Sequence, residues 1–223
     1  DYLKYDFRPC EPDLVQRMKA ALTATPRDFA LSLTVDAQLR YADHWRALCN
    51  SYRCNPDTDG SWATTLRHLE LAEDWFPHTG NGHFYDMDML DTGENALYAC
   101  RLTDDEKRFS FTARAFLLSP IQISRPLDTL PDFELSLYAN EEVLAVSQDA
   151  LTRPPVKLPE QNGLRLYSRG LENGDTALAV FNPGDDAAAF SIDLDTRCVC
   201  RDLWQKADVG TADTLRESLP GHC

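Results

Sequence analysis

The sequence has few basic residues and no long apolar run. Lysine and arginine number 22 against 36 aspartate and glutamate residues, which gives a formal net charge of -14. This charge repels phosphate backbones and anionic membrane surfaces, so no nucleic acid partner is expected. Apolar runs such as Ala115-Phe116-Leu117-Leu118 fall far short of the roughly 20 residues that cross a bilayer. No membrane span is predicted.

The seven cysteines lack the spacing of a structural metal site. The sequence has no C-x-x-C pair and no histidine at zinc-finger spacing, and its cysteine number is odd. Cys49 and Cys54 flank a turn-rich segment, and either a disulfide bridge or two buried thiols fits this arrangement. The chain begins at Asp1 without a methionine, so the lack of a signal peptide carries no information about export, and upstream sequence is expected.

Apolar residues make up 43% of the chain and aromatic residues 10%, which is typical of a folded protein with a core. Up to about Asp149, short apolar runs alternate with stretches of helical periodicity, the pattern of β/α units around a parallel sheet. Thr103 and Glu106 have the spacing of a capping box and predict a helix that ends before Pro120. Strands are predicted at residues 3–6, 29–34, 51–53, 84–85 and 121–124.

The pattern changes after Thr152-Arg153-Pro154-Pro155, where helical periodicity ends. Beyond it, apolar residues alternate with period two around 164–167, 178–181 and 190–194, which is typical of antiparallel β structure. We therefore predict two domains, a β/α domain over residues 1–152 and an antiparallel β domain over residues 153–223 whose last strand is truncated.

Two aspartates follow predicted strands and fit the chemistry of sugar hydrolysis. Retaining hydrolysis of a glycoside needs one ionised carboxylate and one proton donor, roughly 5 to 5.5 Å apart. Asp6 closes the first predicted strand, and Lys4 shares its face and favours its ionised form. Asp57 lies in a loop four residues past Arg53. In a parallel barrel both would meet at the carboxyl ends of the strands.

A family resemblance agrees with this pair. Its five segments, in order, are Tyr2-Leu3-Lys4-Tyr5-Asp6; Asn50-Ser51-Tyr52-Arg53 with Asp57 and Trp62; Asp86-Met87-Asp88-Met89-Leu90; Leu102 through Pro120; and Glu142 through Asp149. The chain resembles the α-galactosidase/melibiase family of glycoside hydrolases over nearly its whole length. The resemblance implies a partial (β/α)8 TIM barrel, strands four to eight, followed by an antiparallel β-sandwich-like domain. On this interpretation the N-terminal half of that barrel is missing from the chain, and it is the expected structural partner.

The resemblance also assigns roles to single residues. It implies Asp6 as nucleophile and Asp57 as general acid/base, with no metal or organic cofactor. The remaining positions carried over are the sugar-contacting Lys4, Arg53, Asp88, Met89 and Thr34 and the supporting Asp86.

Some positions depart from the family pattern or allow other interpretations. Phe7-Arg8-Pro9-Cys10 follows the nucleophile where the family often has Asn or Gly and then Cys, and Thr34-Val35-Asp36 stands where Glu-Trp is usual. Asp57 lies in a turn-like string and has an alternative role as a simple turn residue. Asp86, Asp88 and Asp91 beside His83 have the alternative of holding a hard cation.

The expected function is therefore hydrolysis of terminal α-galactosides in an oligosaccharide or glycoconjugate. The departure at Thr34 leaves an α-N-acetylgalactosaminidase, a β-L-arabinopyranosidase or an isomalto-type glycosidase as alternatives. A non-catalytic carbohydrate-binding fragment is the alternative from a different class. The acidic balance and the absence of an Asn-x-Ser/Thr sequon favour an extracellular or periplasmic enzyme, and the oligomeric state is not predicted.

Overall fold

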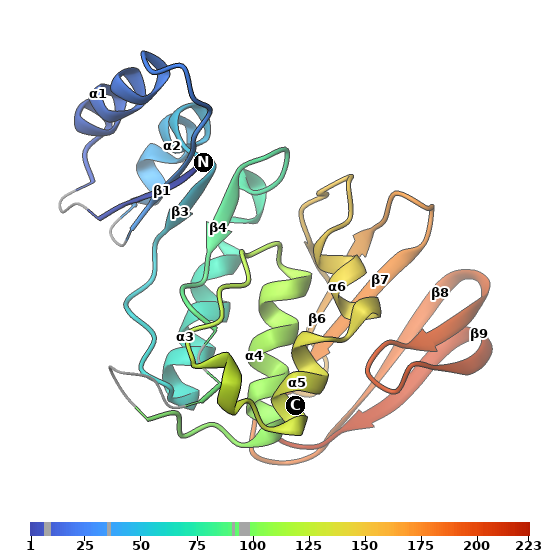
Figure 1. Ribbon diagram of the computed structural model, residues 1–223. Helices are drawn as coiled ribbons and strands as arrows, with labels where there is room; N and C mark the ends of the chain where they lie inside the picture. The colour runs from blue at the N-terminus through green and yellow to red at the C-terminus, as the bar shows by residue number, and fades with distance from the viewer. Residues whose placement is uncertain (7–9, 35–36, 91, 94–98) are drawn as a thin grey trace.

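The computed structural model describes residues 1–6, 10–34, 37–90, 92–93 and 99–223. Its first part is built on a parallel sheet in which four strands pair in chain order (Figure 1). The strands are β1 (Tyr2–Tyr5), β2 (Ala30–Leu33), β3 (Ser51–Arg53) and β4 (Phe84–Asp86). Four of the five predicted strands are thus present.

Helices connect these strands, as the periodicity predicts. The connecting segments are α1 (Pro12–Thr23), the 3-10 turn η1 (Leu39–Tyr41), α2 (Ala42–Leu48), α3 (Trp62–Glu73) and the 3-10 turn η2 (Phe76–His78). Pro12 stands in the first turn of α1, where its missing N–H has no cost. The Ser61 hydroxyl caps α3 by accepting from the Thr64 N–H.

The helix after β4 begins where the capping box predicts. It is α4 (Asp104–Phe116), and both hydrogen bonds of the box, between Thr103 and Glu106, are formed. After the 3-10 turn η3 (Leu127–Thr129), two short helices follow, α5 (Asp132–Tyr138) and α6 (Glu141–Ser147). The Asn140 side chain caps α6.

The predicted fifth strand, residues 121–124, is reduced to one parallel bridge between Leu90 and Ile123. The Leu90 N–H donates to the Gln122 carbonyl, but the Leu90 carbonyl accepts from the Ser124 hydroxyl. The Ser124 hydroxyl thus donates the hydrogen bond that a main-chain N–H donates in a regular parallel ladder. Pro120, which has no N–H, precedes the segment.

The second part is antiparallel. Strands β5 (Val156–Lys157), β6 (Arg165–Gly170) and β7 (Thr176–Phe181) form one sheet, and β8 (Ala188–Asp202) and β9 (Ala207–Leu219) form a long hairpin. An apolar cluster around Leu164, Leu166 and Phe190 lies between the two sheets. The observed fold is therefore a parallel α/β region followed by an antiparallel β domain (Figure 1).

The two parts pack closely. The Tyr167 hydroxyl of β6 donates to the Glu73 carboxylate of α3 at 2.6 Å. The buried Arg169 of β6 donates to the main-chain carbonyl of Phe116 at 2.9 Å and to that of Val146. Tyr167 and Phe181 of the β domain also belong to the main core of the α/β region. This shared core holds the domains in one arrangement.

The described residues contain no disulfide, so Cys49 and Cys54 are free thiols, Cys49 buried and Cys54 half-buried. Burial raises the pKa of Cys49 to about 12. No helix in the described part of the chain combines the length and apolarity that a membrane crossing requires.

Candidate active site

Four of the predicted residues lie at one level, just past or at the ends of the parallel strands. The pairing of Tyr5 with Leu33, Leu33 with Tyr52, and Tyr52 with Tyr85 puts the next residue of each strand in one row. That row contains Asp6, Thr34, Arg53 and Asp86. Since side chains alternate along a strand, these four share one face of the sheet.

The other face of the sheet is apolar. Leu31, Leu33, Tyr52 and Tyr85 are buried at 2% exposure or less in the main core. This separation explains the polar end row: one face packs against helices, and the other presents charged side chains.

Arg53 joins two of the predicted carboxylates directly. Its guanidinium donates to Asp88 at 2.8 Å and also contacts Asp57. The Arg53 and Asp88 side chains are 6% and 1% exposed, whereas that of Asp57 is 75% exposed. The buried Asp88 therefore compensates the arginine charge, and the arginine orients an accessible carboxylate.

The loop after β4 is shaped by its own carboxylates. Asp88 has a φ of 67°, in the left-handed region that Asp tolerates better than most residues. Its N–H donates to Asp86 at 2.8 Å, and its carboxylate accepts from the Thr58 N–H at 2.8 Å. Burial raises the pKa of Asp86, against the opposing effect of the Lys4 charge. The hydrogen bond from Thr58 thus connects the loop that carries Asp57 to the loop that carries Asp88.

Arg114 of α4 supports this loop and was not foreseen from the sequence. Its guanidinium donates to the carbonyls of Met87 at 3.0 Å, Met89 at 2.9 Å and Asp88 at 3.3 Å. The side chain also bonds Ser110 one turn earlier. The available signal was a charge within the apolar stretch Phe109 to Phe116, because a buried arginine must have partners.

His68 and Asn55 support the loop of Asp57. The His68 Nε2 atom and the Asn55 side-chain amide lie 3.0 and 2.9 Å from the Pro56 carbonyl. Burial, followed by the nearby Arg114 charge, lowers the pKa of His68 to about 4, so the ring is neutral at pH 7. The sequence assigned no role to this histidine, since its spacing matches no catalytic triad.

The structure thus brings Arg53, Asp57 and Asp88 into contact. Asp86 and Met89 join them through the loop after β4, with Met89 half-buried. Lys4 and Asp6 are exposed on β1 and just beyond it. Thr34 is buried, and its N–H donates to the Tyr5 carbonyl at 3.2 Å. The chemical roles of all these residues stay predictions.

Other predicted positions bear less on the site. Phe7-Arg8-Pro9, Val35-Asp36 and Asp91 lie outside the described residues. His83 of the suggested cation site is bonded through Nδ1 to the Cys49 carbonyl at 2.7 Å. Within the described ranges, no three His, Cys, Asp or Glu side chains are grouped so that they could hold a metal ion.

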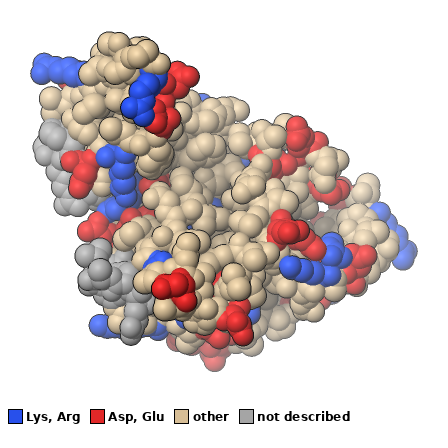
Figure 2. All heavy atoms as spheres, viewed as in Figure 1, with Lys and Arg blue, Asp and Glu red and all other residues tan. Residues whose placement is uncertain are grey.

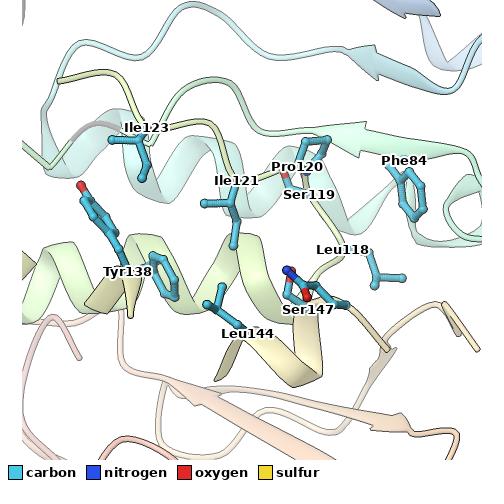
Figure 3. A pocket seen from close by; sticks show the side chains of 11 residues that line it. Phe84, Leu118, Ser119, Pro120, Ile121, Ile123, Tyr138, Leu144 and Ser147 are labelled. Carbon is cyan, nitrogen blue, oxygen red and sulfur yellow. The ribbon is translucent and has the colours of Figure 1, made fainter. Parts of the chain in front are cut away.

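A cavity of about 470 Å³ lies beside the sheet (Figure 3). Phe84, two residues before Asp86, lines it on β4, and Ile121, Ile123, Tyr138 and Leu144 surround it from the segment after α4 and from α5 and α6. No carboxylate and no basic side chain lines it. The cavity therefore suits apolar side chains better than a sugar.

Charged side chains of both signs are interspersed over the face that Figure 2 shows. Lysine and arginine form no continuous patch on that face. This distribution offers no electrostatic track for a nucleic acid backbone there.

Sequence comparison relates both parts of the chain to known proteins. The α-galactosidase C-terminal β-sandwich domain family matches residues 161–222. The chain is 29% identical to α-galactosidase A of Cellvibrio japonicus, over 80% of this chain and 48% of that protein. It is 28% identical to α-galactosidase 3 of Arabidopsis thaliana, over 100% of this chain and 53% of that protein. The chain thus spans about half the length of these curated relatives.

Solved structures share the fold over the whole chain. A β-L-arabinopyranosidase from Geobacillus stearothermophilus superposes with a TM-score of 0.93 at 25% identity, covering 100% of this chain and 56% of that one. The α-galactosidase of Saccharomyces cerevisiae, solved with raffinose, superposes with a TM-score of 0.81 at 19% identity, covering 100% and 70%. The parallel α/β region and the antiparallel β domain together thus match part of each of these structures, 56% of the first and 70% of the second.

Proposed function

Because this chain belongs to the α-galactosidase/melibiase family of glycoside hydrolases, we propose that it supplies the catalytic carboxylates of a retaining exo-glycosidase acting on terminal α-galactosides. Full activity belongs to the enzyme that also carries the upstream half of the barrel. The α-galactosidases among its relatives support the substrate class.

The observation that carries the proposal is the contact of Arg53 with Asp57 and Asp88, at the level of Asp6. Neighbouring strands are roughly 4.8 Å apart, so the main chains at Asp6 and Arg53, two strands apart, are roughly 10 Å apart. Two side chains that extend inward from these positions can flank one sugar ring. A retaining pair needs its carboxyl groups roughly 5 to 5.5 Å apart.

In the proposed first step, the Asp6 carboxylate attacks the anomeric carbon. The bond from that carbon to the leaving-group oxygen breaks, and Asp57 gives its proton to that oxygen. In the second step, Asp57 takes a proton from water, and the water oxygen displaces Asp6. Lys4 stabilises the ionised Asp6, Arg53 orients Asp57, and Asp88 and Met89 contact the sugar.

Azide rescue of two alanine variants tests these roles separately. Asp6→Ala is expected to reduce hydrolysis of an aryl α-galactoside by orders of magnitude, and azide should then give the β-galactosyl azide by direct displacement. Asp57→Ala is expected to lower turnover of a poorly activated galactoside by roughly 10² to 10⁴-fold. With an activated aryl substrate and azide, this variant should give the α-galactosyl azide, because azide intercepts the glycosyl-enzyme.

Asp59→Ala is the matched control, since Asp59 is an exposed carboxylate of the same loop and should be dispensable for turnover. The products are identified by NMR of the anomeric proton. Unchanged hydrolysis by Asp6→Ala, or the same azide anomer from both variants, contradicts the proposed mechanism.

Thr34 gives a reason to test other sugars. It is a small buried residue that follows β2, the strand between those of Asp6 and Arg53, and it stands where the family usually has Glu-Trp. A panel of nitrophenyl glycosides should rank α-galactoside first. A higher kcat/KM for α-N-acetylgalactosaminide, β-L-arabinopyranoside or α-glucoside would assign the enzyme to that substrate instead. The first two are substrates named for relatives of this chain.

The upstream half of the barrel is the proposed partner of the open side of the sheet. Strand β1 and segment 121–124 lie at the two ends of the strand row, and the apolar cavity offers packing surface for further strands.

The non-catalytic alternative predicts galactose binding without turnover. Calorimetry with galactose and an activity assay on one sample separate the catalytic from the non-catalytic function.

Export to an extracellular or periplasmic compartment is likewise a proposal, tested by cell fractionation.

A further inference from the structure

Two cysteines lie side by side on the hairpin of the β domain. Cys198 and Cys200 occupy alternate positions of β8, so both side chains point to the same face of the strand. Cys198 is exposed and Cys200 is partly exposed. Both are free thiols, and neither is in a disulfide. They form an accessible dithiol.

The partner strand leaves this dithiol uncovered. Ala212 of β9 lies opposite Cys198, and Gly210 lies opposite Cys200, so no bulky side chain shields either sulfur atom from across the hairpin. The ladder is irregular on both sides of this stretch. Arg201, the next residue, is engaged by the carboxylates of Glu142 and Asp208 at 2.7 and 2.9 Å.

A direct disulfide fits this spacing poorly. Two residues of an extended strand are roughly 6.6 Å apart at their Cα atoms, near the upper limit of about 6.8 Å for disulfides. A ligand that spans two sulfur atoms fits the spacing better.

The number of ligands and their softness select the ion. The described residues contain no group of three or more metal-ligating side chains, so the pair can offer only two protein ligands. Structural zinc needs four. Thiolates prefer soft ions such as Cu(I), which accept two-coordinate binding. We propose that Cys198 and Cys200 form a two-thiolate site for a soft monovalent cation such as Cu(I).

Binding would proceed without any change of oxidation state. The two thiols release two protons to solvent, and the two sulfur atoms each form a bond to Cu(I). The complex then carries one negative charge. The site lies in the β domain and does not depend on the proposed glycosidase function.

The test is an anaerobic titration of the purified protein with Cu(I) against a chromogenic Cu(I) chelator. Wild type should bind one ion tightly. Cys198→Ser and Cys200→Ser should each weaken this binding by about 100-fold or more, because each removes the second arm of a chelate. X-ray absorption of the wild-type complex should show two sulfur neighbours at the copper.

Cys223→Ser is the matched control, since Cys223 is a partly exposed thiol outside this pair and its loss should leave the affinity unchanged. Thermal melts confirm that the serine variants are folded. Equal affinity in wild type and both serine variants, or an equal loss in Cys223→Ser, overturns the proposal.

Discussion

Arg114 supports the loop of Asp88 through the main chain of that loop. It donates to three successive main-chain carbonyls, those of Met87, Asp88 and Met89, from a position 2% exposed inside α4. Carbonyls in a buried loop need donors, since an unpaired buried polar group costs free energy. One guanidinium thus stabilises a loop distant from it in sequence, including the left-handed Asp88.

Arg114→Lys tests this dependence at the residue scale. A lysine has one ammonium group instead of the planar fork and cannot serve the three carbonyls together. The free energy of unfolding is expected to fall by about 1 to 3 kcal/mol, measured by urea denaturation, and kcat/KM should fall with it.

Arg108→Lys is the control for this substitution. Arg108 lies on the same helix, is 32% exposed and pairs with the neighbouring Asp105. Its replacement should change the free energy of unfolding by no more than about 0.5 kcal/mol. A similar loss in both variants would contradict the specific role of Arg114.

At the scale of elements, α4 contacts α3, α5 and α6 and also strand β7 of the β domain. Its N-terminus is closed by Thr103 and Glu106, its middle packs Phe109 and Phe111 into two apolar clusters, and Arg114 supports the loop after β4. Glu106 also binds His222 at 2.7 Å. The start of this helix therefore affects both domains.

Thr103→Ala removes the side chain that caps α4. Its hydroxyl accepts from the Glu106 N–H at 3.3 Å. Loss of an N-cap hydroxyl is expected to lower the free energy of unfolding by about 1 kcal/mol, measured by chemical denaturation. Thr23→Ala, at an exposed helix end, should change it by less than about 0.5 kcal/mol. Equal effects of the two substitutions would contradict a capping role.

At the scale of the whole molecule, the residues at the end of the described chain connect the two domains. His222 contacts Glu106 of α4 through Nδ1 and Asp185 of the β domain through Nε2 at 2.9 Å, and its ring stacks on Trp62 at 4.5 Å between centroids. A Cβ at Gly221 would collide with the main-chain carbonyls of Asp185 and Gly184. Only glycine fits this close approach.

This contact predicts a pH-dependent stability. Partial burial lowers the pKa of His222, but its hydrogen bonds to Asp185 and Glu106 outweigh burial and raise the pKa overall. The contribution of protonated His222 to the free energy of unfolding is therefore complete below about pH 6.5, the pKa of an unfolded histidine. It is lost as pH rises through the folded-state value.

Thermal melts across this pH window should show wild type losing its advantage over His222→Gln as pH increases. His44→Gln, at an exposed position of α2, should parallel wild type throughout. A constant difference between wild type and His222→Gln at all pH values would contradict the linkage.

Much of the fold was predictable because its signals are local. Ser51–Arg53 forms a strand with the predicted bounds, and the Thr103 capping box starts α4. Segment 121–124 was predicted as a strand, but Ser124 uses its side chain to satisfy Leu90. The domain boundary at residue 152 stays a prediction. Composition could not reveal that Tyr167 and Arg169 of the β domain form hydrogen bonds to the α/β region.

The sequence alone determined the order of the elements, the family resemblance and the candidate carboxylates, because periodicity, caps and motifs are properties of neighbouring residues. Only the tertiary structure decided which charges meet. Arg53 contacts Asp88 across 35 positions, Arg114 reaches the loop after β4, and His222 reaches Glu106 across 116 positions. Such contacts follow from packing, in which buried charges take the partners that the folded chain brings within reach.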